Sequence, residues 1–184
     1  MVVEVLSKKG WGGSTLALDF MRRDFVRQFL HKPVKTRPWS WVQIDGSAAS
    51  DAAFFPPALP YELRRAVAEK KLFWIRVSEK SAPGVVQTLL DSGLCEGVML
   101  SGLDQFSRWS SSQVWARRWQ LSARRGASHF LWVHEKSESL VGFDVRLEWT
   151  APGVFEIKRG HGFIEGKGKH VVLRRHGNSD QSAA

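Results

Sequence analysis

A glycine-rich stretch follows an apolar run near the start of the chain, which is where a phosphate-binding loop would be expected. That loop has the pattern G-x-x-x-x-G-K-[ST], in which backbone N–H groups cradle phosphates and the lysine reaches the β- and γ-phosphates. The corresponding segment here runs from Ser7 to Ser14. Gly12 takes the second glycine position and Ser14 the magnesium-binding hydroxyl, but Gly13 stands where the lysine belongs.

These replacements predict a degenerate phosphate loop. Its residues are Ser7, Gly10, Gly12, Gly13, Ser14 and Thr15. The N-terminus of the following helix could still hold an anion weakly through its free N–H groups. Two alternatives stay open. One is an ordinary glycine turn between a strand and a helix, and the other is an active ATPase with a rearranged site that uses Lys8 or Lys9 and Asp104.

Basic residues form two further candidate sites, both for nucleic acid or for a protein partner. The first is on a helix that also carries Trp115 and Trp119; its arginines are Arg117, Arg118, Arg124 and Arg125. The alternative is a tryptophan face in the core and a solvated arginine face. The second is a basic, glycine-containing C-terminal stretch with Lys158, Arg159, Lys167, Lys169, Arg174 and Arg175. Flexible basic hairpins commonly contact phosphate backbones, whereas a solvated loop is the simpler interpretation.

Histidine and cysteine give no further site. None of the six histidines has a strong metal-ligand spacing with the single cysteine or with a carboxylate. Cys95 follows a helix and precedes an apolar strand, so we expect it in the core. No metal and no cofactor is expected.

The elements that would position these residues alternate between strands and helices. Strands are expected at residues 2–6, 39–45, 72–77, 97–100 and 129–133, and helices at 14–30, 61–70, 83–90 and 110–125. Pro83 suits the first position of a helix, and Gly93 and Gly126 suit helix ends. Antiparallel strands are expected at 145–149, 154–157 and 171–173.

This pattern predicts an α/β fold. Its mostly parallel central sheet is covered on both faces, with antiparallel strands at the C-terminal edge. Residues 1–176 are expected to form a single domain and residues 177–184 a disordered tail.

The order of these segments resembles the core of the RecA recombinases. The resemblance rests on Glu4 to Leu6 before the loop, Ser14 to Leu18 after it, and the segments 41–47, 91–101 and 142–147. It covers about residues 2–150 and implies a RecA-like three-layer sandwich.

The chain departs from that family at its catalytic positions. Ser47 stands where the family has the glutamate that activates water, and Ser101 where it has the magnesium-linked Walker B aspartate. His134 or Glu135 takes the position of the γ-phosphate sensor. Because phosphoryl transfer depends on positioning and electrostatic stabilisation, the resemblance implies a protein that is not an enzyme.

As a compact and degenerate RecA-like protein, the chain resembles the ImuA and SulA group of the bacterial DNA-damage (SOS) response. The segment order favours the ImuA type, a translesion-synthesis factor. Such a factor accompanies an error-prone polymerase and an inactive Y-family partner, and RecA itself is a further expected partner. The alternative is a SulA-like inhibitor of cell division that binds FtsZ.

Composition bounds the partners and the compartment. A net charge of +9 and a sequence pI of about 10.1 favour an anionic partner, so direct DNA binding is a further alternative. No apolar run is long enough to cross a membrane, and no signal peptide is recognisable. With one cysteine, a cytoplasmic location is expected.

Overall fold

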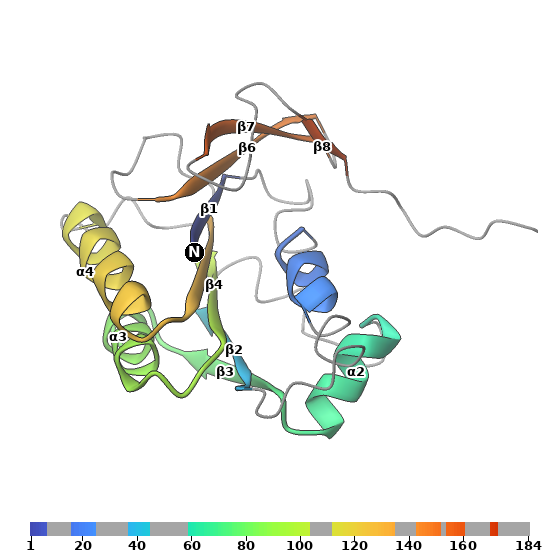
Figure 1. Ribbon diagram of the computed structural model, residues 1–184. Coiled ribbons are helices and arrows are strands. Elements are labelled where there is room, and N and C mark those ends of the chain that lie inside the picture. The colour runs from blue at the N-terminus through green and yellow to red at the C-terminus, as the bar shows by residue number, and fades with distance from the viewer. Residues whose placement is uncertain are drawn as a thin grey trace, which may run out of the picture.

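Short apolar strands join into one sheet in the computed structural model (Figure 1). The residues that the structure describes are 1–6, 16–24, 37–44, 59–103, 112–134, 143–151, 154–160 and 170–172. The strands are β1 (Val2–Leu6), β2 (Trp39–Ile44), β3 (Leu72–Val77), β4 (Gly97–Leu103), β5 (His129–His134), β6 (Val145–Ala151), β7 (Val154–Gly160) and β8 (His170–Val172).

The sheet has the strand order β3-β2-β4-β5-β1-β6-β7-β8. Neighbours from β3 to β6 pair in parallel, whereas β7 is antiparallel to both β6 and β8. The expected α/β class, with a mostly parallel sheet and antiparallel strands at the C-terminal edge, is therefore confirmed. The first strand of the chain lies inside the sheet, between β5 and β6.

Helices cover both faces of this sheet. The helix at residues 16–24 and α2 (Tyr61–Ala68) lie on one face, and α3 (Ala82–Ser92) and α4 (Ser112–Arg125) lie side by side on the other (Figure 1). The connections from β1 to β2 and from β2 to β3 run one way over the first face. Those from β3 to β4 and from β4 to β5 run the opposite way over the second face. All four crossovers therefore have one hand, as parallel sheets require.

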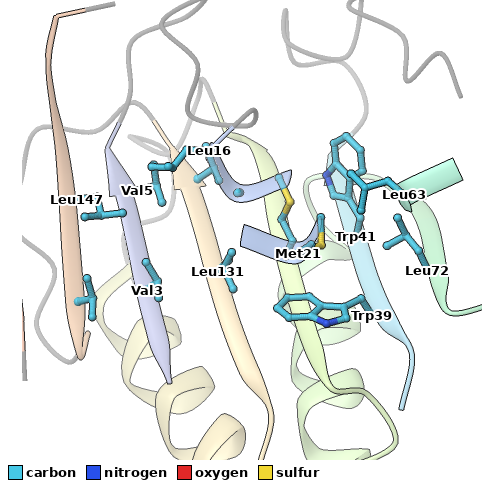
Figure 2. Close-up of a cluster of buried hydrophobic side chains, with 14 of the residues drawn as sticks. Val3, Val5, Leu16, Met21, Trp39, Trp41, Leu63, Leu72, Leu131 and Leu147 are labelled. Carbon is cyan, nitrogen blue, oxygen red and sulfur yellow. The ribbon is translucent and has the colours of Figure 1, made fainter. Parts of the chain in front are cut away.

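Each face has its own apolar core. Figure 2 shows the first core, where Leu16 and Met21 of the 16–24 helix and Leu63 of α2 approach the sheet residues Trp41 and Leu131. In the second, Trp119 of α4 is fully buried, and its ring meets that of Trp132 on β5 edge-on, with centroids 5.1 Å apart. Burying apolar surface on both faces is the main favourable contribution to folding.

Local details agree with most of the expected boundaries. Gly93 ends α3 in the left-handed region with φ of 63°, as its lack of a side chain allows. Pro83 is the second rather than the first residue of that helix. Cys95 is free and buried, as expected. The remainder of the expected first helix and the tail 177–184 lie outside the described residues.

Within the described part of the chain, no helix is long and apolar enough to cross a membrane.

Candidate functional site

In open α/β sheets, ligands bind at the edge formed by the carboxyl ends of the parallel strands. The binding site lies at the point where two neighbouring strands lead to connections on opposite faces of the sheet. That point lies between β2, which leads to α2 on one face, and β4, which leads to α4 on the other. The residues that follow β1, β2, β4 and β5 at this edge lie outside the described ranges. They include every predicted phosphate-loop residue: Ser7, Gly10, Gly12, Gly13, Ser14 and Thr15. Ser47, Asp104 and Glu135 also lie among them.

The elements on either side of the predicted phosphate loop are described. β1 ends at Leu6, in the interior of the sheet, and a helix is in place by Leu16. Leu16 and Ala17 are buried in the core that includes Val3 and Val5 of β1. A strand in the interior of the sheet and a helix therefore flank the predicted phosphate loop.

Two tryptophan side chains donate hydrogen bonds to polar side chains on neighbouring strands, one between β2 and β4 and one between β3 and β2. Trp41 Nε1 donates a hydrogen bond to Ser101 Oγ at 2.7 Å, and Ser101 is only 4% exposed. Beside it, Trp74 Nε1 donates to Gln43 Oε1 at 2.8 Å. Where the resemblance expects a magnesium-binding aspartate, the chain has a neutral hydroxyl that already accepts an indole hydrogen bond.

A buried ionic network crosses β5, β1 and β6 on the face covered by α3 and α4. Glu4 Oε1 lies 3.0 Å from His134 Nε2, and Glu4 Oε2 lies 3.6 Å from Arg146 Nε. The side chains of Glu4 and His134 are fully buried, and that of Arg146 is 11% exposed. Sequence reasoning missed this network, although one signal was available: Glu4 is a charged residue inside an otherwise apolar strand.

The chemistry open to this network follows from its burial. A dissolved substrate cannot reach a carboxylate and an imidazole that have no exposed surface, so the three groups are suited to holding strands together. His134 is one of the two residues, with Glu135, at the position where the resemblance implies a γ-phosphate sensor. Its imidazole contacts Glu4 and lies 4.8 Å, centroid to centroid, from the ring of Trp132.

At the opposite edge of the sheet, Arg37 joins the ends of two helices. Its guanidinium donates to the carbonyl oxygens of Gly93 (2.9 Å), Gly126 (3.0 Å) and Ala127 (2.6 Å), which follow α3 and α4. A cation suits this place because helix C-termini carry partial negative charge. Nearby, burial lowers the pKa of the His129 imidazole.

The four predicted arginines of α4 are all exposed on the outer side of that helix. Arg124 and Arg125 have acidic partners, Asp144 at 3.1 Å and Asp91 at 3.0 Å. Arg117 donates to the Gln120 amide oxygen at 3.4 Å, and Arg118 lies over the ring of Trp115 at 5.2 Å from its centroid. The expected tryptophan face is confirmed as core, since Trp119 is fully buried and Trp115 packs against it.

The second predicted basic group is described only in part. Lys158 and Arg159 belong to β7, where Arg159 pairs with Arg146 of β6 along the backbone. Lys167, Lys169, Arg174 and Arg175 lie outside the described residues.

The described residues contain no group of three or more histidine, cysteine, aspartate or glutamate side chains that could hold a metal ion. No protein-family model matches the chain, and no curated protein matches it.

Proposed function

We propose that this chain is a non-catalytic, RecA-like accessory protein of the bacterial DNA-damage response. It acts as an ImuA-like mutagenesis factor through protein contacts, with DNA as a second class of partner. RecA, an error-prone polymerase and its inactive Y-family partner are the protein partners that the resemblance implies. The chain thereby combines two properties, a nucleotide-binding architecture and the absence of nucleotide chemistry.

The hydrogen bond from Trp41 to Ser101 is the observation that supports the second property most directly. In nucleotide sites at least one carboxylate usually helps to hold the magnesium ion, whereas the group at this position is a buried, neutral hydroxyl that already accepts a hydrogen bond from Trp41. Gly13 removes the phosphate-loop lysine from the sequence as well. Without the lysine and the metal acid, little remains to stabilise the charge of a transferring phosphoryl group.

The architecture supports the first property. A central parallel strand leads through a glycine-rich connection into a helix, which is the context that the phosphate-loop motif requires. The mostly parallel sheet, covered on both faces, is compatible with a RecA-like core.

Titration calorimetry with ATP and magnesium, combined with a phosphate-release assay, tests whether the chain binds and hydrolyses the nucleotide. We expect neither binding heat nor hydrolysis from the purified wild-type chain. Ser14→Ala is the matched control, because it removes only the hydroxyl at the remaining magnesium position. Hydrolysis by the wild type that Ser14→Ala abolishes would sink the non-catalytic claim, whereas activity that persists in the variant reveals a contaminating enzyme.

A further inference from the structure

The outer face of α4 repeats one pattern twice. Val114 and Leu121 are seven residues apart, and each is followed three and four positions later by a pair of arginines. Val114 is 51% exposed and Leu121 is 46% exposed, although both are aliphatic. Ala116 and Ala123, two positions after them, are buried against the core. The repeat therefore places its small residues inward and its large aliphatic residues in solvent.

Residues seven apart on a helix lie on the same side, two turns from each other. Val114 and Leu121 thus form a line along the outer surface of α4, with Arg117 and Arg118 between them. In Figure 1, α4 lies on the outside of the molecule, across the sheet from α2. An apolar line at heptad spacing with charges beside it is the pattern by which one helix receives another.

The charge of this surface is positive and partly unpaired. The segment Ser112–Arg125 has four arginines and no acidic residue. Two of these arginines contact Asp144 and Asp91, as described above. Arg117 and Arg118 contact no carboxylate within the described residues. The arginines without an acidic partner are thus the two that lie between the exposed aliphatic side chains.

We propose that the outer face of α4 is a docking surface for an acidic amphipathic helix of a partner protein. The partner places aliphatic side chains against Val114 and Leu121, and carboxylates against Arg117 and Arg118. This deepens the proposed function and rests on it only in that the chain works through protein contacts.

The aliphatic residues favour a protein over nucleic acid as the occupant. Val114 and Leu121 stabilise a complex only when an apolar surface of the partner covers them and removes them from water. A phosphate backbone would use the arginines alone, and two of those are already neutralised by Asp91 and Asp144. An acidic helix with its own apolar line uses both features.

The test is fluorescence anisotropy with the full chain and two labelled probes. One probe is a synthetic three-heptad helix with leucine at heptad positions and glutamate beside them, and the other is a single-stranded oligonucleotide. We expect the peptide to bind. Leu121→Ser should weaken it roughly tenfold through lost apolar burial, and the double variant Arg117→Glu/Arg118→Glu should abolish binding. Leu121→Ser should leave binding of the oligonucleotide unchanged.

Leu94→Ser and Arg64→Glu are the matched controls, because both residues are exposed and lie outside α4. Both should leave peptide binding unchanged, and circular dichroism should show every variant folded. Absence of peptide binding, or binding that Leu121→Ser does not weaken, would overturn the proposal. Loss of oligonucleotide affinity in the arginine double variant, together with no peptide binding to the wild type, would assign α4 to nucleic acid. Calorimetry with ATP tests the proposed function separately, since it does not involve α4.

Discussion

The Glu4 carboxylate is fully buried between ionisable side chains of the two neighbouring strands. It lies 3.0 Å from His134 and 3.6 Å from Arg146, on the two strands that flank its own. A buried charge is costly unless it is paired, so removing one member of such a set leaves the others uncompensated. The network therefore makes the position of β1 between β5 and β6 sensitive to a change in one side chain.

We predict that Glu4→Gln, which keeps the size but removes the charge, lowers the free energy of unfolding by about 3 kcal/mol. Urea denaturation measures this loss. Glu62→Gln is the matched control, because Glu62 lies 3.5 Å from Arg22 in a pair that solvent reaches. Its loss should stay below about 1 kcal/mol. Equal losses in the two variants would show that burial does not set the strength of the Glu4 network.

The C-terminal ends of α3 and α4 pack closely against each other. A Cβ atom on Gly126 would collide with the carbonyl oxygen of Leu90, a backbone atom of α3. Gly126 does not have a positive φ. The residue after it, Ala127, does, with φ of 48°. Glycine is thus required here by the close approach of two backbones.

We predict that Gly126→Ala pushes the two helices apart and lowers the free energy of unfolding by about 2 kcal/mol. Gly84→Ala on α3 is the control, since nothing lies within 4 Å of its new Cβ. Alanine is favoured over glycine in a helix by about 0.5 to 1 kcal/mol, so this control should gain stability. Thermal denaturation should show a lower melting temperature for Gly126→Ala and a higher one for Gly84→Ala, each relative to the wild type. A Gly126→Ala variant as stable as the wild type would contradict the close approach of the two backbones.

The sequence predicted these elements well because each one is local. Continuous apolar runs predict buried strands, and Pro83 and Gly93 mark the limits of α3 through their own backbone preferences. What the sequence could not supply was register. Glu4 and His134 are 130 positions apart in sequence, and Ser101 meets Trp41 only because β4 lies beside β2. Gly126 was expected as a helix end, but its contact with Leu90 depends on the packing of α3 against α4.

At the edge of the sheet formed by the amino ends of the parallel strands, groups from distant parts of the chain surround His129. Its ring stacks on Trp39 with centroids 6.0 Å apart, and Nδ1 has no hydrogen-bond partner among the described residues. Burial lowers its pKa most, and the Met1 amine and Arg37 act in the same direction. Asp24 and Glu96 act in the opposite direction without reversing the shift.

A histidine with a lowered pKa in the folded state makes stability depend on pH. Above the ordinary histidine pKa of about 6.5, both states leave the ring neutral and its contribution is complete. As the pH falls below that value, the unfolded chain takes up a proton that the folded ring resists. The free energy of unfolding then drops by at most about 1.4 kcal/mol per pH unit for one proton.

We therefore predict that wild type loses more stability than His129→Phe between about pH 7.5 and 5.5. Phenylalanine keeps the ring against Trp39 and removes the titration. Urea denaturation at each pH measures the difference. Asp91→Asn is the control: hydrogen bonds from Gln87 and Ser122 lower the pKa of the Asp91 carboxyl, so it titrates below this interval. Parallel pH profiles for wild type and His129→Phe would mean that another group controls acid stability at this edge.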